Sequence, residues 1–205
     1  VYTESHDEVA NGQARVPAEV NEGDPTGWHA QKRSTLGAAL VMTSPGIPMI
    51  FQGQEFLTGG WFRDDVPLDW DQREDFHGTV RLYRDLIRLR RNWHDTTRGL
   101  SGHEVAVTHL DEDANLLAFH RWADGGPGDS VVVVVNLDAD EKHDHRIAMP
   151  AAGRWNLELN SDAVVYSDDF GDVASHDIEA VSDDSGTWAT VSLAPYTVLV
   201  YSLSA

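Results

Sequence analysis

The stretch Val1-Tyr2-Thr3-Glu4-Ser5-His6-Asp7 is a short β-prone run that ends in two adjacent side chains able to do acid–base or electrostatic work. A second apolar run, Ser44-Pro45-Gly46-Ile47-Pro48-Met49-Ile50-Phe51, is followed by the polar group Gln52-Gly53-Gln54-Glu55. Between the two runs, apolar residues recur at helical spacing up to residue 43. Strand, helix and strand in this order, with polar side chains after each strand, predict part of a parallel barrel.

These blocks resemble the alpha-amylase superfamily of glycoside hydrolases and transglycosylases. Thr3–Asp7 looks like the last conserved block of that family, and Gly46–Phe56 looks like its eighth barrel strand. The segment Trp61–Trp70 is similar to the segment after this strand in branching-enzyme-like members. The resemblance implies an α/β part followed by an all-β part. Residues 1–98 would supply the last strands and helices of a (β/α)8 barrel, and residues 99–205 an antiparallel β-sandwich.

The residue pattern also changes along the chain, from helical spacing to the alternation of strands. Residues 79–93 have apolar side chains at helical spacing, with arginines mostly on the opposite face. From Val105 the period becomes two, and turn residues separate the β-prone segments. The segments expected to form strands are Val105–His109, Leu116–Trp122, Ser130–Asn136, Arg154–Asn160, Thr187–Leu193 and Tyr196–Leu203.

Asp7 and His6 are the candidate chemistry of the N-terminal part. By the resemblance, Asp7 is the third catalytic carboxylate of the family, which binds the sugar and favours the oxocarbenium-like transition state, and His6 hydrogen-bonds the sugar hydroxyls. Retaining cleavage also needs a nucleophile and an acid/base group about 5 Å apart, and these would lie upstream of Val1. We therefore expect a fragment that is inactive alone. Without the resemblance, Asp7 would be interpreted as a turn cap and His6 as an ordinary polar residue.

Four further residues are candidates for substrate binding. Glu4 places a charge in a presumed buried strand, so either it has a partner or it faces a lined cavity, and its place in the block favours the cavity. Gln54 and Glu55 either line the sugar site or secure the loop. Trp61 could offer a stacking face to a glucose ring, although aromatic residues at a barrel rim also serve packing.

The composition is strongly acidic, with a net charge of −19 and 23 Asp to 11 Glu. Residues 1–104 hold 11 Lys+Arg against 16 Asp+Glu, and residues 105–205 hold 4 against 18. We interpret this surface as an adaptation to high salt, with an ordinary acidic protein as the alternative. The charge disfavours nucleic acid and anionic membranes as partners. No stretch approaches the roughly 18 apolar residues that a membrane span requires.

Cofactor and metal sites are not indicated by the sequence. The chain has no cysteine, which excludes disulfides and thiolate metal sites. Its ten histidines show no metal-ligand spacing, and His143 and His145, on one face of a strand, are expected to be exposed to solvent. We therefore predict no metal and no cofactor. The N-terminal segment lacks the basic region of a secretory signal, and we expect a cytoplasmic location.

Three functions remain open. The resemblance favours part of a 1,4-alpha-glucan branching enzyme, with an alpha-amylase-type hydrolase as the alternative. A non-catalytic carbohydrate-binding module would instead use aromatic side chains of the β part, namely Trp122, Trp155 and Trp188. A structural or interaction fragment would need a partner for its open barrel edges. The expected partners are an α-glucan and either the N-terminal remainder of the barrel or a second copy of the chain.

Overall fold

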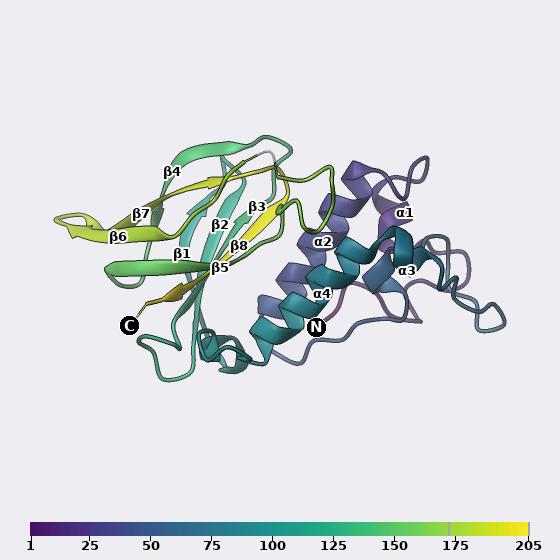
Figure 1. Ribbon diagram of the computed structural model, residues 1–205, viewed down its shortest axis with the longest axis horizontal. Coiled ribbons are helices and arrows are strands. Elements are labelled where there is room, and N and C mark those ends of the chain that lie inside the picture. The colour runs from purple at the N-terminus through teal and green to yellow at the C-terminus, as the bar shows by residue number, and fades with distance from the viewer. Residues whose placement is uncertain (172, 205) are drawn as a thin grey trace.

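The computed structural model describes residues 1–171 and 173–204, and Figure 1 shows a helical part beside a β part. The helices are α1 (Val16–Val20), α2 (Trp28–Thr43), α3 (Gln72–Asp75) and α4 (His77–Arg90), with short 3-10 turns at Gln54–Phe56 and Arg98–Ser101. The strands are β1 (Glu104–Asp111), β2 (Leu116–Trp122), β3 (Val131–Asn136), β4 (Lys142–Ala148), β5 (Gly153–Asn160), β6 (Ile178–Asp183), β7 (Gly186–Leu193) and β8 (Thr197–Leu203).

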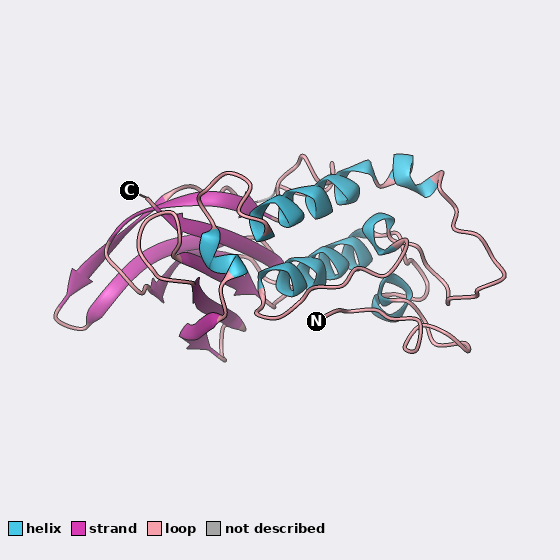
Figure 2. Ribbon diagram, turned by 90° about the horizontal axis from the view of Figure 1, so that it is seen from below, coloured by secondary structure: helices cyan, strands magenta, loops and turns pink. Residues whose placement is uncertain are grey.

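Helices α2 and α4 lie side by side (Figure 2) and confirm the two predicted helices. Helix α4 buries Leu82, Leu86 and Leu89, whose spacing places them on one face. It ends three residues earlier than predicted because Asn92 takes a left-handed conformation, with φ of 51°. The amides of Asn92 and Trp93 then donate to the carbonyls of Leu89 and Arg88, both at 2.9 Å, which is the Schellman arrangement of a helix end.

All eight strands join one antiparallel sheet in the order β1-β2-β3-β8-β5-β6-β7-β4. The valines of β3 are buried on both faces of the sheet. Val131, Val133 and Val135 join a core shared with α2 and α4. Val132 and Val134 pack instead in a second core, enclosed by strands alone. The antiparallel all-β architecture expected for the C-terminal part is therefore present.

Two strands, β4 and β6, were not among the predicted strand segments, although His143 and His145 of β4 were expected on one face of a strand. Most side chains of both are exposed or half-buried, so the apolar alternation that marks a half-buried strand is absent. The structure assigns no strand to residues 1–7 or 44–51, all of which it describes, so the prediction of strands there was wrong. These segments lie side by side, joined by Val1 N–H to the Ile47 carbonyl at 2.8 Å and Met49 N–H to the Val1 carbonyl at 3.0 Å. Two hydrogen bonds do not make a strand ladder.

The helical and β parts share more than an apolar core. Lys32 of α2 contacts Asp162, which follows β5, at 2.6 Å, and both side chains are almost wholly buried. Arg121 of β2 donates to the carbonyl oxygens of Thr43, at the end of α2, and Gly102. The predicted boundary between residues 98 and 99 is therefore crossed by buried polar contacts, and it stays a prediction.

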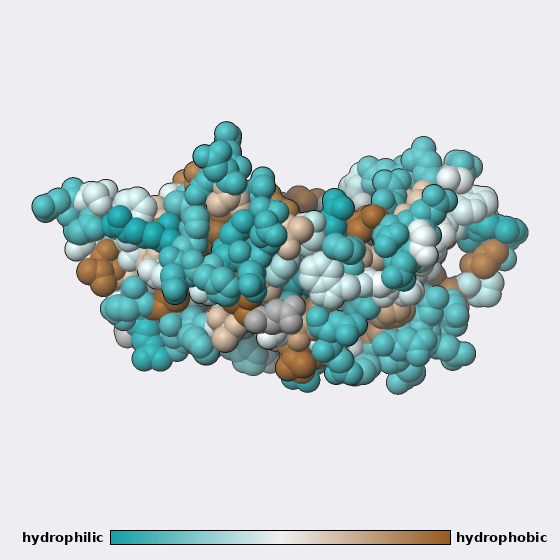
Figure 3. All heavy atoms as spheres, turned by 90° about the horizontal axis from the view of Figure 1, so that it is seen from above, coloured by the Kyte–Doolittle hydropathy of each residue, from teal (hydrophilic) through white to brown (hydrophobic). Residues whose placement is uncertain are grey.

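The face shown in Figure 3 is covered mostly by hydrophilic residues, with small isolated hydrophobic areas. Among the described residues, no helix has the length and apolar character needed to cross a membrane.

Candidate functional site

His6 and Asp7 lie in a tight turn that presents both side chains to solvent. The amides of Glu8 and Val9 both donate to the Ser5 carbonyl at 3.1 Å, and this closes the turn around the pair. Nε2 of His6 lies 3.1 Å from Oδ1 of Asp7, and the two side chains are 70% and 84% exposed. An exposed carboxylate is free to meet a ligand, in contrast to one held in a cap.

Trp61 reaches the same place from a second loop. A parallel bridge joins Ala10 to Phe62, and the Phe62 amide donates to the Val9 carbonyl at 2.5 Å, so the two loops are tied together. A groove of about 610 Å³ lies between the two loops. Its lining comes from both loops: His6, Asp7, Ala10, Asn11, Trp61, Phe62, Arg63, Asp64 and Asp65. The structure thus brings together three of the six predicted site residues.

The Trp61 side chain is half-exposed on this groove. The guanidinium of Arg63 lies 5.7 Å from the centroid of its ring, within the range of a cation–π contact. Phe62 packs edge-on against Phe51, with ring centroids 5.2 Å apart, so the neighbouring aromatic residue anchors the loop. Of the two functions considered for Trp61, stacking on a ligand fits this exposure better than packing.

Glu4 does not face the groove. Its side chain is fully buried, and Nε and Nη2 of Arg15 donate to Oε2 at 3.0 and 2.7 Å. The Val16 amide, at the start of α1, donates to Oε1 at 2.9 Å. Of the two options for Glu4, the structure therefore shows a partner and not a lined cavity. The pair fixes the loop before α1, and contact of Glu4 with substrate is not supported by this geometry.

Gln54 and Glu55 also lie away from the groove. Oε1 of Gln54 accepts from the Phe51 amide at 3.1 Å, and its Nε2 donates to the Thr3 hydroxyl. Gln54 therefore secures the two N-terminal segments to each other, the second of the options considered. Oε2 of Glu55 is buried without a hydrogen-bond partner among the described residues. Burial, with the charges of Glu4 and Glu55, raises the pKa of the nearby Tyr83 hydroxyl, so this phenol stays neutral.

The tryptophans proposed for a carbohydrate-binding module differ in exposure. Trp155 is fully buried and donates to the Ala151 carbonyl at 3.1 Å, so its assignment as a stacking residue was wrong. Trp122 stacks on His120, with ring centroids 4.5 Å apart. Trp188 carries the guanidinium of Arg146 at 4.1 Å from its centroid. The three do not form one aromatic row, which weakens the binding-module hypothesis.

One cluster was missed by the sequence analysis. His109, Asp111 and His145 each offer one ligand atom, and these atoms lie within 4.8 Å of one another. All three side chains are partly buried, and His145, expected to be exposed, is 23% exposed. The only sequence signal was His109 and Asp111 two residues apart on a strand, which places both on one face. Nothing in the sequence placed His145 beside them.

Comparisons with known proteins identify the C-terminal part. Residues 107–204 match the family model described as "Alpha amylase, C-terminal all-beta domain". Residues 107–204 therefore belong to the C-terminal all-beta domain of the alpha-amylase family. This match and the curated relatives described next together confirm the resemblance to the alpha-amylase superfamily.

Curated relatives extend the match over most of the chain. It is 33% identical to the 1,4-alpha-glucan branching enzyme GlgB of Myxococcus xanthus, over 95% of this chain and 27% of the relative. The enzyme of the same name from Nocardia farcinica is 33% identical over 93% of this chain and 26% of its own length. The chain thus spans about a quarter of the curated relatives it matches.

A solved structure supports the fold. A debranching enzyme from Nostoc punctiforme superposes with a TM-score of 0.65 at 15% identity, covering 98% of this chain and 34% of that one. At this identity the likeness shows a shared fold and not a shared reaction.

Proposed function

We propose that this chain forms the C-terminal part of a 1,4-alpha-glucan branching enzyme and contributes Asp7 and His6 to its sugar site. The observation that supports this most is the convergence of His6, Asp7 and Trp61 on one open groove of about 610 Å³. A carboxylate, an imidazole and an aromatic face are the groups that bind a sugar hydroxyl pair and the flat side of a pyranose ring. The relatives named as branching enzymes supply the reaction class.

In the proposed mechanism, the Asp7 carboxylate binds the sugar at the reacting unit. Its negative charge favours the oxocarbenium-like transition state more than the neutral ground state, so it contributes to rate and not only to affinity. The imidazole of His6, 3.1 Å from Asp7, holds the carboxylate in place and offers a second hydrogen-bonding atom. The nucleophile and the acid/base group would come from outside residues 1–205.

We further propose that residues 1–98 complete a (β/α)8 barrel with that remainder. The two segments predicted as barrel strands expose apolar side chains to water: Ile47 is 87% exposed, Val1 51% and Met49 40%. Exposed apolar groups on paired extended segments are what a missing neighbour would cover. Self-association of the chain is the alternative way to cover them.

The function is tested on the intact parent enzyme with linear amylose as substrate. Branching activity decreases iodine staining and leaves new α-1,6 linkages, which a debranching enzyme then cleaves into short chains. A hydrolase of the alpha-amylase type instead releases reducing sugar without such linkages. Absence of both products would overturn the proposal, whereas binding of amylose without turnover would favour the carbohydrate-binding module.

A further inference from the structure

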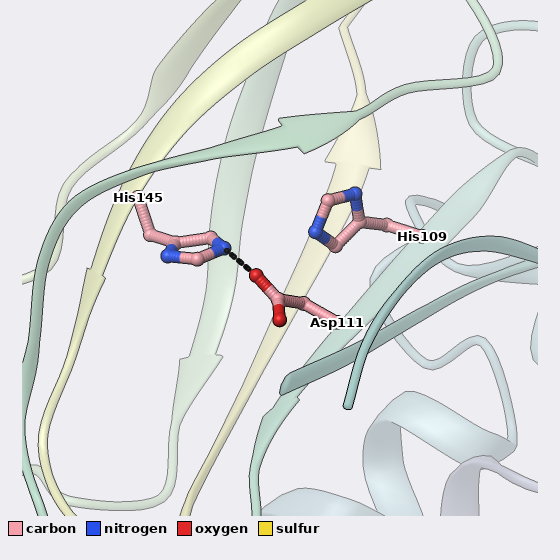
Figure 4. Close-up of side chains that lie close together, drawn as sticks. All are labelled: His109, Asp111 and His145. Carbon is pink, nitrogen blue, oxygen red and sulfur yellow. Dashed lines mark ion pairs between the residues drawn. The ribbon is translucent and has the colours of Figure 1, made fainter. Parts of the chain in front are cut away.

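Strands β1 and β4 stand at opposite ends of the strand order, yet they contact each other in space. His109 and Asp111 project from β1 and His145 from β4 at this junction (Figure 4). The three side chains point toward one another, and their ligand atoms lie within 4.8 Å. None of them takes part in the groove of His6 and Asp7.

Both strands depart from regular pairing where they present these side chains. The register of β1 shifts between Val107 and His109, and that of β4 shifts between Lys142 and His145. Within the second irregularity, Asp144 has a φ of 49°, and its amide leaves the ladder to donate to the Ser192 hydroxyl at 3.1 Å. A bulge re-aims a side chain at some cost in pairing. Two of them, on facing edge strands, turn His109 and His145 toward the same point.

The ligand atoms of His109 and Asp111 differ in their hydrogen bonding. Nε2 of His109 is inaccessible to solvent and has no hydrogen-bond partner among the described residues. Oδ1 of Asp111 accepts from the Ala114 amide at 3.0 Å, which orients the carboxylate and leaves Oδ2 toward His145. An outer hydrogen bond of this kind commonly holds a metal-binding carboxylate.

The distances suit a small divalent ion. Nε2 of His145 lies 3.4 Å from Oδ2 of Asp111, longer than a good charge-assisted hydrogen bond. Two ligands of a tetrahedral zinc ion stand about 3.3 Å apart, from bond lengths near 2.0–2.1 Å. The His109 ring lies edge-on to that of His145 with centroids 5.7 Å apart, and its ligand atom, within 4.8 Å of the other two, would have to approach them by up to about 1.5 Å to supply the third ligand.

We propose that His109, Asp111 and His145 bind a zinc ion, which joins β1 to β4 and keeps a fourth position for water. Two imidazoles and one carboxylate favour zinc and similar transition metals over Mg²⁺ or Ca²⁺, which prefer oxygen ligands alone. Binding of zinc through Nε2 leaves a proton on Nδ1 of His109. Because a protonated nitrogen cannot accept a hydrogen bond, the contact from the Ala148 amide to Nδ1, already long at 3.4 Å, is lost when zinc binds.

The test uses the 205-residue chain, stripped of metal with a chelator and titrated with Zn²⁺ against a chromophoric competitor. The expected result is one tight site, weakened at least about 100-fold in His109→Gln, His145→Gln and Asp111→Asn. His143→Gln is the matched control, since His143 lies on the same strand and is paired with Glu141 at 3.1 Å. Zinc at about 100 times its Kd should also raise the Tm by about 5–10 °C.

The chain carries 34 carboxylates, so weak binding at scattered acidic groups must be told apart from the site. Equal binding by the wild type and all variants, or an equal loss in His143→Gln, would overturn the proposal. Far-UV circular dichroism shows whether each variant folds. Because Asp111→Asn keeps the shape of the side chain, Co²⁺ added to it supplies a second readout: the visible bands of a nitrogen- and oxygen-bound ion should appear in the wild type and disappear in this variant. Absence of these bands from both proteins would mean that the cluster is only an ion pair, and equal bands in both would exclude Asp111 as a ligand; either result would overturn the proposal.

Discussion

Replacing Lys32 with Met should destabilise the fold strongly. Nζ of Lys32 lies 2.6 Å from Asp162 and 3.1 Å from the Thr197 hydroxyl, and the Lys32 and Asp162 side chains are 1% and 2% exposed. In the variant, the Asp162 carboxylate stays buried but loses its cation. The Gly171 amide, which donates to Oδ2 at 3.1 Å, remains as a hydrogen-bond donor. Removing one member of a buried pair costs about 3–5 kcal/mol, a large share of the roughly 5–15 kcal/mol that stabilises a domain.

Urea unfolding of the 205-residue chain, followed by tryptophan fluorescence at fixed protein concentration, measures this loss. Lys142→Met is the matched control because Lys142, the other lysine of the chain, pairs with Asp138 at 3.0 Å in a more exposed setting. We expect a much smaller loss there. The double variant Lys32→Met with Asp162→Asn should reveal a coupling energy of about 2–3 kcal/mol. A loss below about 1 kcal/mol in Lys32→Met, or separate unfolding of helices and sheet, would show that this buried pair does not hold the helical and β parts together.

Three further predictions concern the same chain. The Tm should rise from low to molar KCl because counterions screen a net charge of −19, and a flat or falling Tm would contradict adaptation to salt. Burial lowers the pKa of His120 below its ordinary 6.5, against a smaller opposing effect of Asp129, so the unfolded chain takes up the proton first. Stability should therefore fall as the pH decreases from about 7 through 6.5, and His120→Gln should lose less over that range in thermal melts; equal losses would count against it. Finally, the chain alone should show no activity on amylose, because it would supply only Asp7 of the proposed catalytic set, and it should associate in light scattering because its open barrel segments lack a neighbour; a compact, active monomer would be the opposite result.

The sequence predicts best where one residue pattern is repeated over a whole element. Val131–Val135 indicates a strand buried on both faces, and the leucines of α4 indicate an amphipathic helix. The end of that helix was misplaced because it depends on one local backbone choice, the left-handed Asn92, and not on a period. The extent of strand β4 was not predicted, apart from the alternation of His143 and His145, because its side chains are mostly polar and only Ile147 is fully buried.

Only part of the candidate site was predicted, because the remaining contacts depend on how distant segments meet in the fold. The exposed pair His6 and Asp7, and Trp61 on the neighbouring loop, follow from the recognised blocks. Glu4 pairs with Arg15, and the path of the loop between them brings the two side chains together. That loop has no apolar periodicity, so the sequence pattern does not predict the pair. His145 reaches His109 only because the two ends of the strand order meet and both strands bulge there, a tertiary feature that neither local sequence contains.

We propose the groove of His6 and Asp7 as the sugar site of an α-glucan enzyme. The direct test is kcat and KM of the intact parent on amylose for Asp7→Asn, with Glu8→Gln as control, since Glu8 is an exposed carboxylate next to Asp7 that does not line the groove. Asn keeps the shape of Asp7 and removes the charge that favours the cationic transition state. We predict that kcat falls by about three orders of magnitude or more while KM changes little, and that Glu8→Gln stays near wild type. Near-normal turnover of Asp7→Asn would contradict the claim.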